Sequence, residues 1–306
     1  MYDSIQVTAG LLVLGQFGRS CRTDLEPKHS TDNRYPGERP EQMKVIDGIP
    51  VWGSPVDEGA LKQIKNCART ADKVALMADH HKGYAVPIGG VVAYENSISP
   101  SGVGYDVACG NKAVCTDASA SEVRRNIATL MDDVWRFLSF GVGRKNDEPV
   151  DHALFDDPAW SLPAVAPLKE MARKQLGTVG SGNHYVDIFE EEILPESRRR
   201  GRRHGCRPGR DRCGLRSGGR LSGLHGAGGR YAYAGRDWVC GRVAKILGAT
   251  ITEEVHNHHN FAWRETHGGK DLWVVRKGAT PAFPGQRGFV GGTMGENLRD
   301  SRRRRE

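Results

Sequence analysis

The sequence predicts an α+β fold, in which helices and strands are mixed without regular alternation. The clearest helical pattern spans residues 121–140, where apolar residues repeat along one stripe: Val123, Ile127, Leu130, Val134 and Phe137. Strand-like segments occur before and after this helix, at residues 73–77, 90–94 and 184–189. The absence of a regular βαβ repeat and of a solenoid period argues against a doubly wound sheet and against a repeat protein.

The remaining elements can be assigned in chain order. A helix is expected after Pro55 with Asp57 as its N-terminal cap, further helices at residues 164–176 and 234–247, and a strand at residues 272–275. The residues of these helices expected to be buried are Leu61, Ile64, Ala68, Trp238, Val243 and Leu247.

Composition divides the chain further. Residues 1–42 are polar and rich in turn-forming residues, which predicts a poorly ordered N-terminal extension. Residues 43–295 carry the regular patterns and are expected to form a single complex mixed α/β domain. An Arg/Gly-rich segment at residues 197–230 interrupts this domain, and residues 296–306 form a basic tail.

The net charge of +7 is concentrated in those two segments. Residues 197–230 hold 11 Arg, ten Gly, no Lys and one acidic residue, and show no hydrophobic period. Such a segment cannot bury enough apolar area to offset its ordering entropy, so we expect it to be disordered. It could be an RNA-binding arm, but the lack of Lys favours an insertion or out-of-frame interval without evolved structure.

The seven cysteines and the hydropathy profile bear on location. The cysteine count is odd and no Cys-x-x-Cys pair occurs, which favours a reducing cytoplasm over a disulfide framework. No apolar run is long enough to span a membrane. We therefore expect a cytoplasmic protein without a membrane partner.

Metal-capable side chains recur among glycines in several blocks. These blocks are residues 77–90, 99–110, 177–190 and 256–265, followed by 275–286 and 291–295. Glycines let the backbone approach a ligand closely, and carboxylate, thiol and imidazole groups are the ligands from which a metal centre is built.

Spacing alone does not distinguish a metal-binding role from a purely structural role for each of these residues. Asp106 and Cys109 are three apart on a Gly-flanked turn or short helix, so both can face one point. A turn-capping Asp and a buried Cys would give the same pattern. His184 alone is more often a structural histidine, whereas the cluster of His256, His258 and His259 is rarer and suggests a metal. Thiolate and imidazole ligands by themselves would favour zinc.

Taken together, the blocks resemble the RtcB family of RNA-splicing ligases. The matching motifs are GVGYDVACG (102–110), GSGNH (180–184), HNFA (259–262), RKGATPAFP (276–284) and GGTMG (291–295). The resemblance runs from about residue 43 to 195 and resumes near residue 231.

The resemblance implies a GTP- and metal-dependent RNA ligase that joins RNA 3′-phosphate or 2′,3′-cyclic phosphate ends to 5′-hydroxyl ends through a guanylated intermediate. It implies two manganese ions, a monomeric enzyme, and Asp106, Cys109, His184 and His259 as metal ligands. The implied guanylate-binding residues are Asn183, Tyr185, Val186, Asp187, Asn260, Gly292, Thr293, Met294 and Gly295.

Two departures from the family pattern lead to alternative hypotheses. First, a second metal-binding histidine of the family is missing between residues 195 and 230. Second, the family's guanylate-accepting histidine would lie beyond Gly295. No catalytic nucleophile is therefore assigned, and the C-terminal part is expected to be missing. An HGAG sequence at residues 225–228 stands in the wrong chain order. The alternatives are a catalytically dead metal- or nucleotide-binding fragment, a metal-dependent phosphoesterase, and an RNA-binding module.

Overall fold

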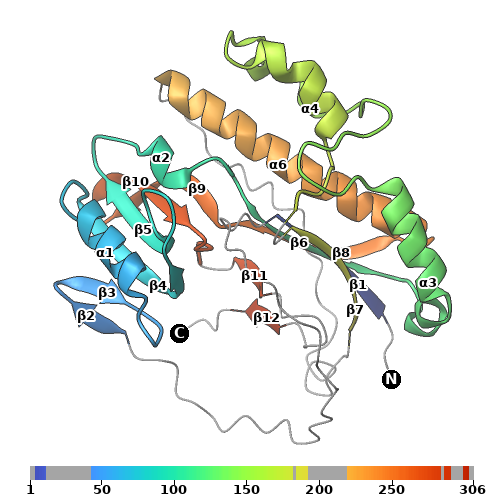
Figure 1. The fold of residues 1–306 in the computed structure, drawn as a ribbon, viewed down its shortest axis with the longest axis horizontal. Helices are drawn as coiled ribbons and strands as arrows, with labels where there is room; N and C mark the ends of the chain where they lie inside the picture. Colours follow the sequence, from blue (N-terminus) through green and yellow to red (C-terminus); the bar gives the residue numbers. More distant parts are fainter. Residues whose placement is uncertain are drawn as a thin grey trace, which may run out of the picture. The chain divides into compact units, whose positions relative to one another are not determined.

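A computed structural model describes residues 4–11, 43–181, 184–191, 219–283, 286–290 and 299–302. Helices and a sheet occur in each of two compact units, which confirms the α+β class (Figure 1). Unit 1 comprises Met1–Val13, Asp106–His259 and Thr280–Glu306, and unit 2 comprises Leu14–Tyr105 and Asn260–Ala279. The two units correspond to two sheets with separate hydrophobic cores.

A four-stranded antiparallel sheet organises unit 1. Its strand order is β7 (Tyr185–Glu191), β1 (Ser4–Leu11), β6 (Gly110–Thr116) and β8 (Ile251–His258). Within the expected N-terminal extension, Ser4–Leu11 forms β1, which pairs with β6 on one side and β7 on the other, while residues 12–42 lie outside the described residues. Its partner strands, β6 and β7, lie far away along the chain, so the local sequence pattern could not predict this strand.

Helix α6 (Gly219–Ile246) lies against this sheet, and α3 (Ala120–Phe137) contacts α6 (Figure 1). Unit 1 also contains α4 (Lys169–Gln175) and short 3-10 helices at Ala153–Asp156, Pro158–Ser161 and Ala166–Leu168. The core joins β6, α3 and α6 through buried side chains: Val114, Val134, Leu138, Val179, Val239, Cys240 and Val243. This apolar cluster holds α3 and α6 against the sheet.

Helix α3 confirms the predicted helix, but its stripe is buried only in part. Val123 and Val134 are buried, whereas Ile127 and Phe137 are 42% and 43% exposed. The guanidinium groups of Arg136 and Arg242 lie over the Phe137 ring, which explains how this aromatic side chain is accommodated near the surface.

The basic segments also differ from expectation where they are described. Helix α6 begins at Gly219, so the last part of the interval 197–230 is helical rather than disordered, and residues 192–218 lie outside the described residues. In the tail, Arg299–Arg302 forms β12, which pairs with β11 (Arg287–Val290). The predicted helix at 234–247 therefore extends much further toward the N-terminus, where Gly and Arg obscured the helical period.

Unit 2 is a six-stranded sheet with one main helix against it. The strand order is β2 (Lys44–Ile46), β3 (Ile49–Val51), β4 (Lys73–His81), β5 (Ile88–Tyr94), β10 (Lys270–Lys277) and β9 (Asn260–His267), accompanied by α1 (Glu58–Cys67) and α2 (Pro100–Val103).

Helix α1 of this unit forms as the sequence predicts. Asp57 caps it by accepting a hydrogen bond from the Ala60 amide at 2.6 Å. Ile64 of the helix and Leu76 of β4 are fully buried in the same core. Over the described residues, the structure has no helix long and apolar enough to cross a membrane.

Candidate functional site

The first part of the site is the turn that joins Asp106 to Cys109. The Cys109 amide donates a hydrogen bond to the Asp106 carbonyl at 3.2 Å, and Ala108 between them has a φ of 59°. Left-handed backbone is unfavourable for alanine, so this turn needs support from its surroundings. Cys109 is 2% exposed, and β6 begins at the next residue, Gly110. The predicted Gly-flanked turn is thus present.

His184 approaches this turn from the start of β7. Its Nε2 atom lies 4.0 Å from Oδ2 of Asp106, and both side chains are largely buried. Gly180 leaves the space that the ring occupies, because a Cβ atom at residue 180 would lie 2.1 Å from Nδ1 of His184. Two sequence-predicted ligands, far apart in the chain, therefore meet.

The protonation of His184 suits a ligand role. Burial lowers the pKa of His184 and outweighs the opposing effect of the Asp106 carboxylate, which favours the neutral imidazole. Neither ring nitrogen has a hydrogen-bond partner among the described residues. A neutral imidazole can donate a nitrogen lone pair to a metal ion.

Cys109 and His259 are brought together through the backbone. The His259 amide donates a hydrogen bond to the Cys109 carbonyl at 2.8 Å, just beyond the register pair of Gly110 with His258. All four predicted metal ligands thus lie in unit 1. In the described part of the chain, however, no group of three or more His, Cys, Asp or Glu side chains is close enough to hold a metal ion. The donor chemistry fits a divalent ion, while the demonstrated side-chain approach is limited to Asp106 and His184.

The predicted guanylate-binding residues are divided. Tyr185 and Asp187 alternate with Val186 along β7, and Val186 packs against the core of unit 1. The Val186 side chain packs in this core, and its contact with the guanylate stays a prediction. Asn260 lies in unit 2, where its Nδ2 atom donates to the Val103 carbonyl at 3.0 Å. Asn183 and Gly292, Thr293, Met294 and Gly295 lie outside the described residues.

The pKa of Tyr185 is affected by Cys109 in the Asp106–Cys109 turn. Burial, followed by the charges of Asp187 and Cys109, raises the pKa of Tyr185 to about 12. Burial also raises the pKa of Asp187. Both observations indicate a poorly solvated environment around β7, in which charge–charge interactions are strengthened.

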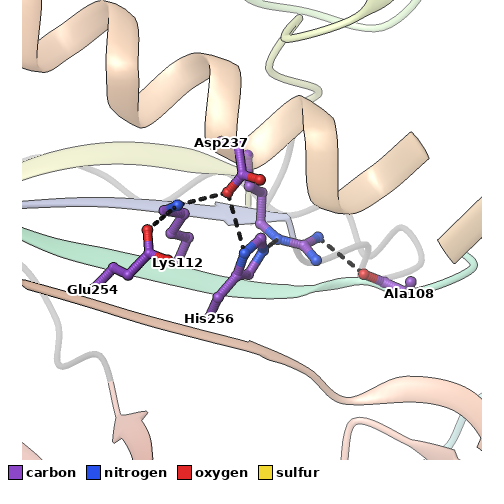
Figure 2. Close-up of polar contacts among 6 residues, drawn as sticks. Ala108, Lys112, Asp237, Glu254 and His256 are labelled. Atoms are coloured by element: carbon purple, nitrogen blue, oxygen red, sulfur yellow. Dashed lines mark hydrogen bonds and ion pairs between the residues drawn. The ribbon is translucent and has the colours of Figure 1, made fainter. Parts of the chain in front are cut away.

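Sequence reasoning missed a charged network, built around the buried Lys112, that reaches this turn (Figure 2). It runs from Glu254 on β8 through Lys112 on β6 to Asp237 on α6, with distances of 2.7 Å and 2.6 Å from Nζ of Lys112. Asp237 also lies 3.3 Å from Nδ1 of His256. The adjacent charged residues 236 and 237 in an otherwise apolar helical stretch were a signal, but the burial of Arg236 could not be deduced from composition.

The comparisons with known proteins agree with the motifs. The family model described as "tRNA-splicing ligase RtcB" matches residues 60–163 and 222–297 of the chain. These ranges contain Asp106, Cys109 and His259 but not His184. The match resumes at residue 222, so it includes HGAG, which the sequence pattern alone had placed in an interval without evolved structure.

Individual relatives give the same result. The chain is 26% identical to the RNA-splicing ligase RtcB of Escherichia coli (strain K12), over 83% of the chain and 77% of the relative. It is 32% identical to the tRNA-splicing ligase RtcB of Thermococcus kodakarensis, over 39% of the chain and 33% of the relative. It is 33% identical to the tRNA-splicing ligase RtcB of Pyrobaculum aerophilum, over 37% of the chain and 30% of the relative.

Proposed function

Because the chain belongs to the tRNA-splicing ligase RtcB family and is an RNA ligase, we propose that it joins RNA ends in a GTP- and metal-dependent reaction. Its substrates would be RNA 3′-phosphate or 2′,3′-cyclic phosphate ends and 5′-hydroxyl ends, joined through a guanylated intermediate. The single observation that carries this proposal is the meeting of Asp106 and His184, which come from two separate motifs of the family.

Asp106, Cys109, His184 and His259 would hold the divalent ions, with manganese as the ion that the family resemblance implies. When bound, such ions neutralise phosphate oxygens and help to deprotonate an attacking hydroxyl group. The position of Cys109 supports this assignment, since its backbone binds both the Asp106 carbonyl and the His259 amide and so places these three residues next to one another. The His184 ring keeps the Asp106 carboxylate within reach of the same point.

Tyr185, Val186, Asp187 and Asn260, with Asn183 and the turn 292–295, would contact the guanylate. The poorly solvated setting of Tyr185 and Asp187 suits a nucleotide site, because polar contacts are stronger where water is excluded. We propose cytoplasmic RNA repair or tRNA splicing as the setting, with the enzyme acting as a monomer.

The test is an RNA joining assay with the full chain, GTP and Mn²⁺, using a labelled strand with a 3′-phosphate and an acceptor with a 5′-hydroxyl. The Cys109→Ser variant is expected to join RNA more than about 100-fold more slowly, because outer partners of metal ligands alone commonly change activity 10–100-fold. Cys67→Ser, a half-buried thiol on α1 in unit 2, should stay within about threefold of wild type, as surface-near substitutions usually do.

The alternatives give distinct results in the same assay. Release of inorganic phosphate from the 3′ end without joining would identify a phosphoesterase. Binding of Mn²⁺ without either reaction would identify a non-catalytic fragment. Equal joining rates for Cys109→Ser and wild type would contradict the proposed metal ligand.

A further inference from the structure

Arg236 is a buried arginine whose hydrogen-bond acceptors are neutral groups and not a carboxylate. It lies on α6, is 3% exposed, and uses its guanidinium to reach two neutral groups. Nη1 donates to the Ala108 carbonyl at 2.9 Å, and Nε donates to Nε2 of His256 at 2.8 Å. Nη2 is buried without a hydrogen-bond partner in the described part of the chain. Desolvating a cation costs free energy, so this placement requires a compensating role.

A chain of contacts fixes the orientation of this guanidinium (Figure 2). Since His256 accepts from Arg236 at Nε2, its proton resides on Nδ1 and faces Asp237 at 3.3 Å. Asp237 is held in turn by Lys112 at 2.6 Å. The ring of Tyr233 stacks on His256 with centroids 3.8 Å apart. The acceptor imidazole therefore has one tautomer and one position, and Arg236 is held with it.

The other end of Arg236 supports a strained backbone. Ala108, whose carbonyl it binds, has a φ of 59° and stands between Asp106 and Cys109. A charged donor forms a stronger hydrogen bond than a neutral one, so it can offset the cost of a left-handed alanine. The charges of Asp106 and Cys109 also act on the Arg236 guanidinium and favour its charged form. It therefore offers a fixed positive charge to the two acidic groups of the turn.

We propose that Arg236 is a positioning residue, which holds the Asp106–Cys109 turn in the conformation that lets both side chains act at one site. The role in metal binding rests on the proposed function, while the hold on the turn does not. Without the guanidinium, the Ala108 carbonyl loses its donor and the turn can relax toward ordinary backbone angles. The carboxylate and the thiol would then no longer face a common point, although both residues would still be present.

The test compares Arg236→Met, Arg236→Lys and Arg242→Met with wild type. Arg242 is a matched control, because it lies on the same helix with its guanidinium exposed over the rings of Phe137 and Trp238. Titration with Mn²⁺ should show about 10–100-fold weaker binding for Arg236→Met and no change for Arg242→Met. Arg236→Lys should recover only part of the affinity, since an ammonium group keeps the charge but not the two-pronged geometry.

A second measurement works without metal and separates the inference from the proposed function. Hydrogen exchange of the Cys109 amide, which is bonded to Asp106, should become about tenfold faster in Arg236→Met and remain unchanged in Arg242→Met. If wild type binds no Mn²⁺, the proposed metal site fails and the exchange rate still decides the role of Arg236. Wild-type exchange at Cys109 in Arg236→Met would overturn the inference. So would acceleration spread evenly over α6 and β6, since that would reveal general loosening.

Discussion

Replacing Gly110 with alanine is expected to lower the free energy of unfolding by about 3 kcal/mol or more, at the upper end of overpacking penalties. A Cβ atom at this position would lie 2.1 Å from the carbonyl oxygen of Asn257 and 2.4 Å from Cα of His258. These obstacles are backbone atoms of β8, so no side-chain rotation can relieve the clash. Strands β6 and β8 would have to separate where the His259 amide binds the Cys109 carbonyl.

Urea unfolding of Gly110→Ala beside Gly241→Ala measures this effect. Gly241 lies inside α6, and a Cβ atom there would meet nothing within 4 Å. Since alanine favours a helix over glycine by about 1 kcal/mol, the control should match or slightly exceed wild-type stability. An unchanged unfolding midpoint for Gly110→Ala would mean that the two strands are further apart than the structure indicates. The variant should also bind Mn²⁺ weakly if the proposed site forms at this junction.

Elements stabilised by interactions between residues close in sequence could be predicted, whereas elements stabilised by distant residues could not. The helix capped by Asp57 and the helix at 120–137 were recognisable because capping and apolar periodicity act within a few residues. Strand β1 was missed because its pairing with β6 and β7 joins distant segments. The arrangement of the two sheets is equally non-local, since strands of each sheet come from both halves of the chain.

The candidate site shows the same limit. Motif spacing identified Asp106 and His184, and the structure brings them within 4.0 Å. It did not identify Arg236, because an arginine on a helix is usually solvated, and only tertiary packing reveals that this one is buried. Val186 packs against the core of unit 1, as strand alternation along β7 requires.

Acidification from pH 6.5 toward pH 4 is expected to destabilise unit 1 through His256. Burial is the largest cause that lowers the pKa of His256 to about 4, with the charges of Arg236 and Lys112 acting in the same direction against Asp237. The unfolded imidazole therefore binds a proton more readily than the folded one. The stabilisation is fully present above pH 6.5 and is lost as the pH falls through the folded pKa, by roughly 3 kcal/mol in all.

Asp237 extends the loss to lower pH. Burial alone would raise the pKa of Asp237. The contacts with His256 and Lys112 outweigh this effect and lower the pKa of Asp237 to about 2. A carboxyl group with a depressed folded pKa contributes stability above its ordinary value of 3.8, and this contribution disappears as the pH falls toward 2. The two residues thus act in sequence, with His256 first and Asp237 second.

The His256→Gln variant isolates the first step. A glutamine oxygen can still accept the hydrogen bond from Arg236, but it does not titrate, so the variant should lose about 3 kcal/mol less than wild type between pH 7 and pH 4. His267→Gln is the matched control, because His267 lies on β9 in unit 2 with its ring exposed and contacts neither Arg236 nor Asp237 in the described part of the chain. Its pH dependence should follow that of wild type. Because every other histidine is retained, the difference between His256→Gln and wild type reports His256 and its contact with Asp237. Parallel stability curves for these two proteins would show that the imidazole is hydrated and not enclosed between α6 and the sheet.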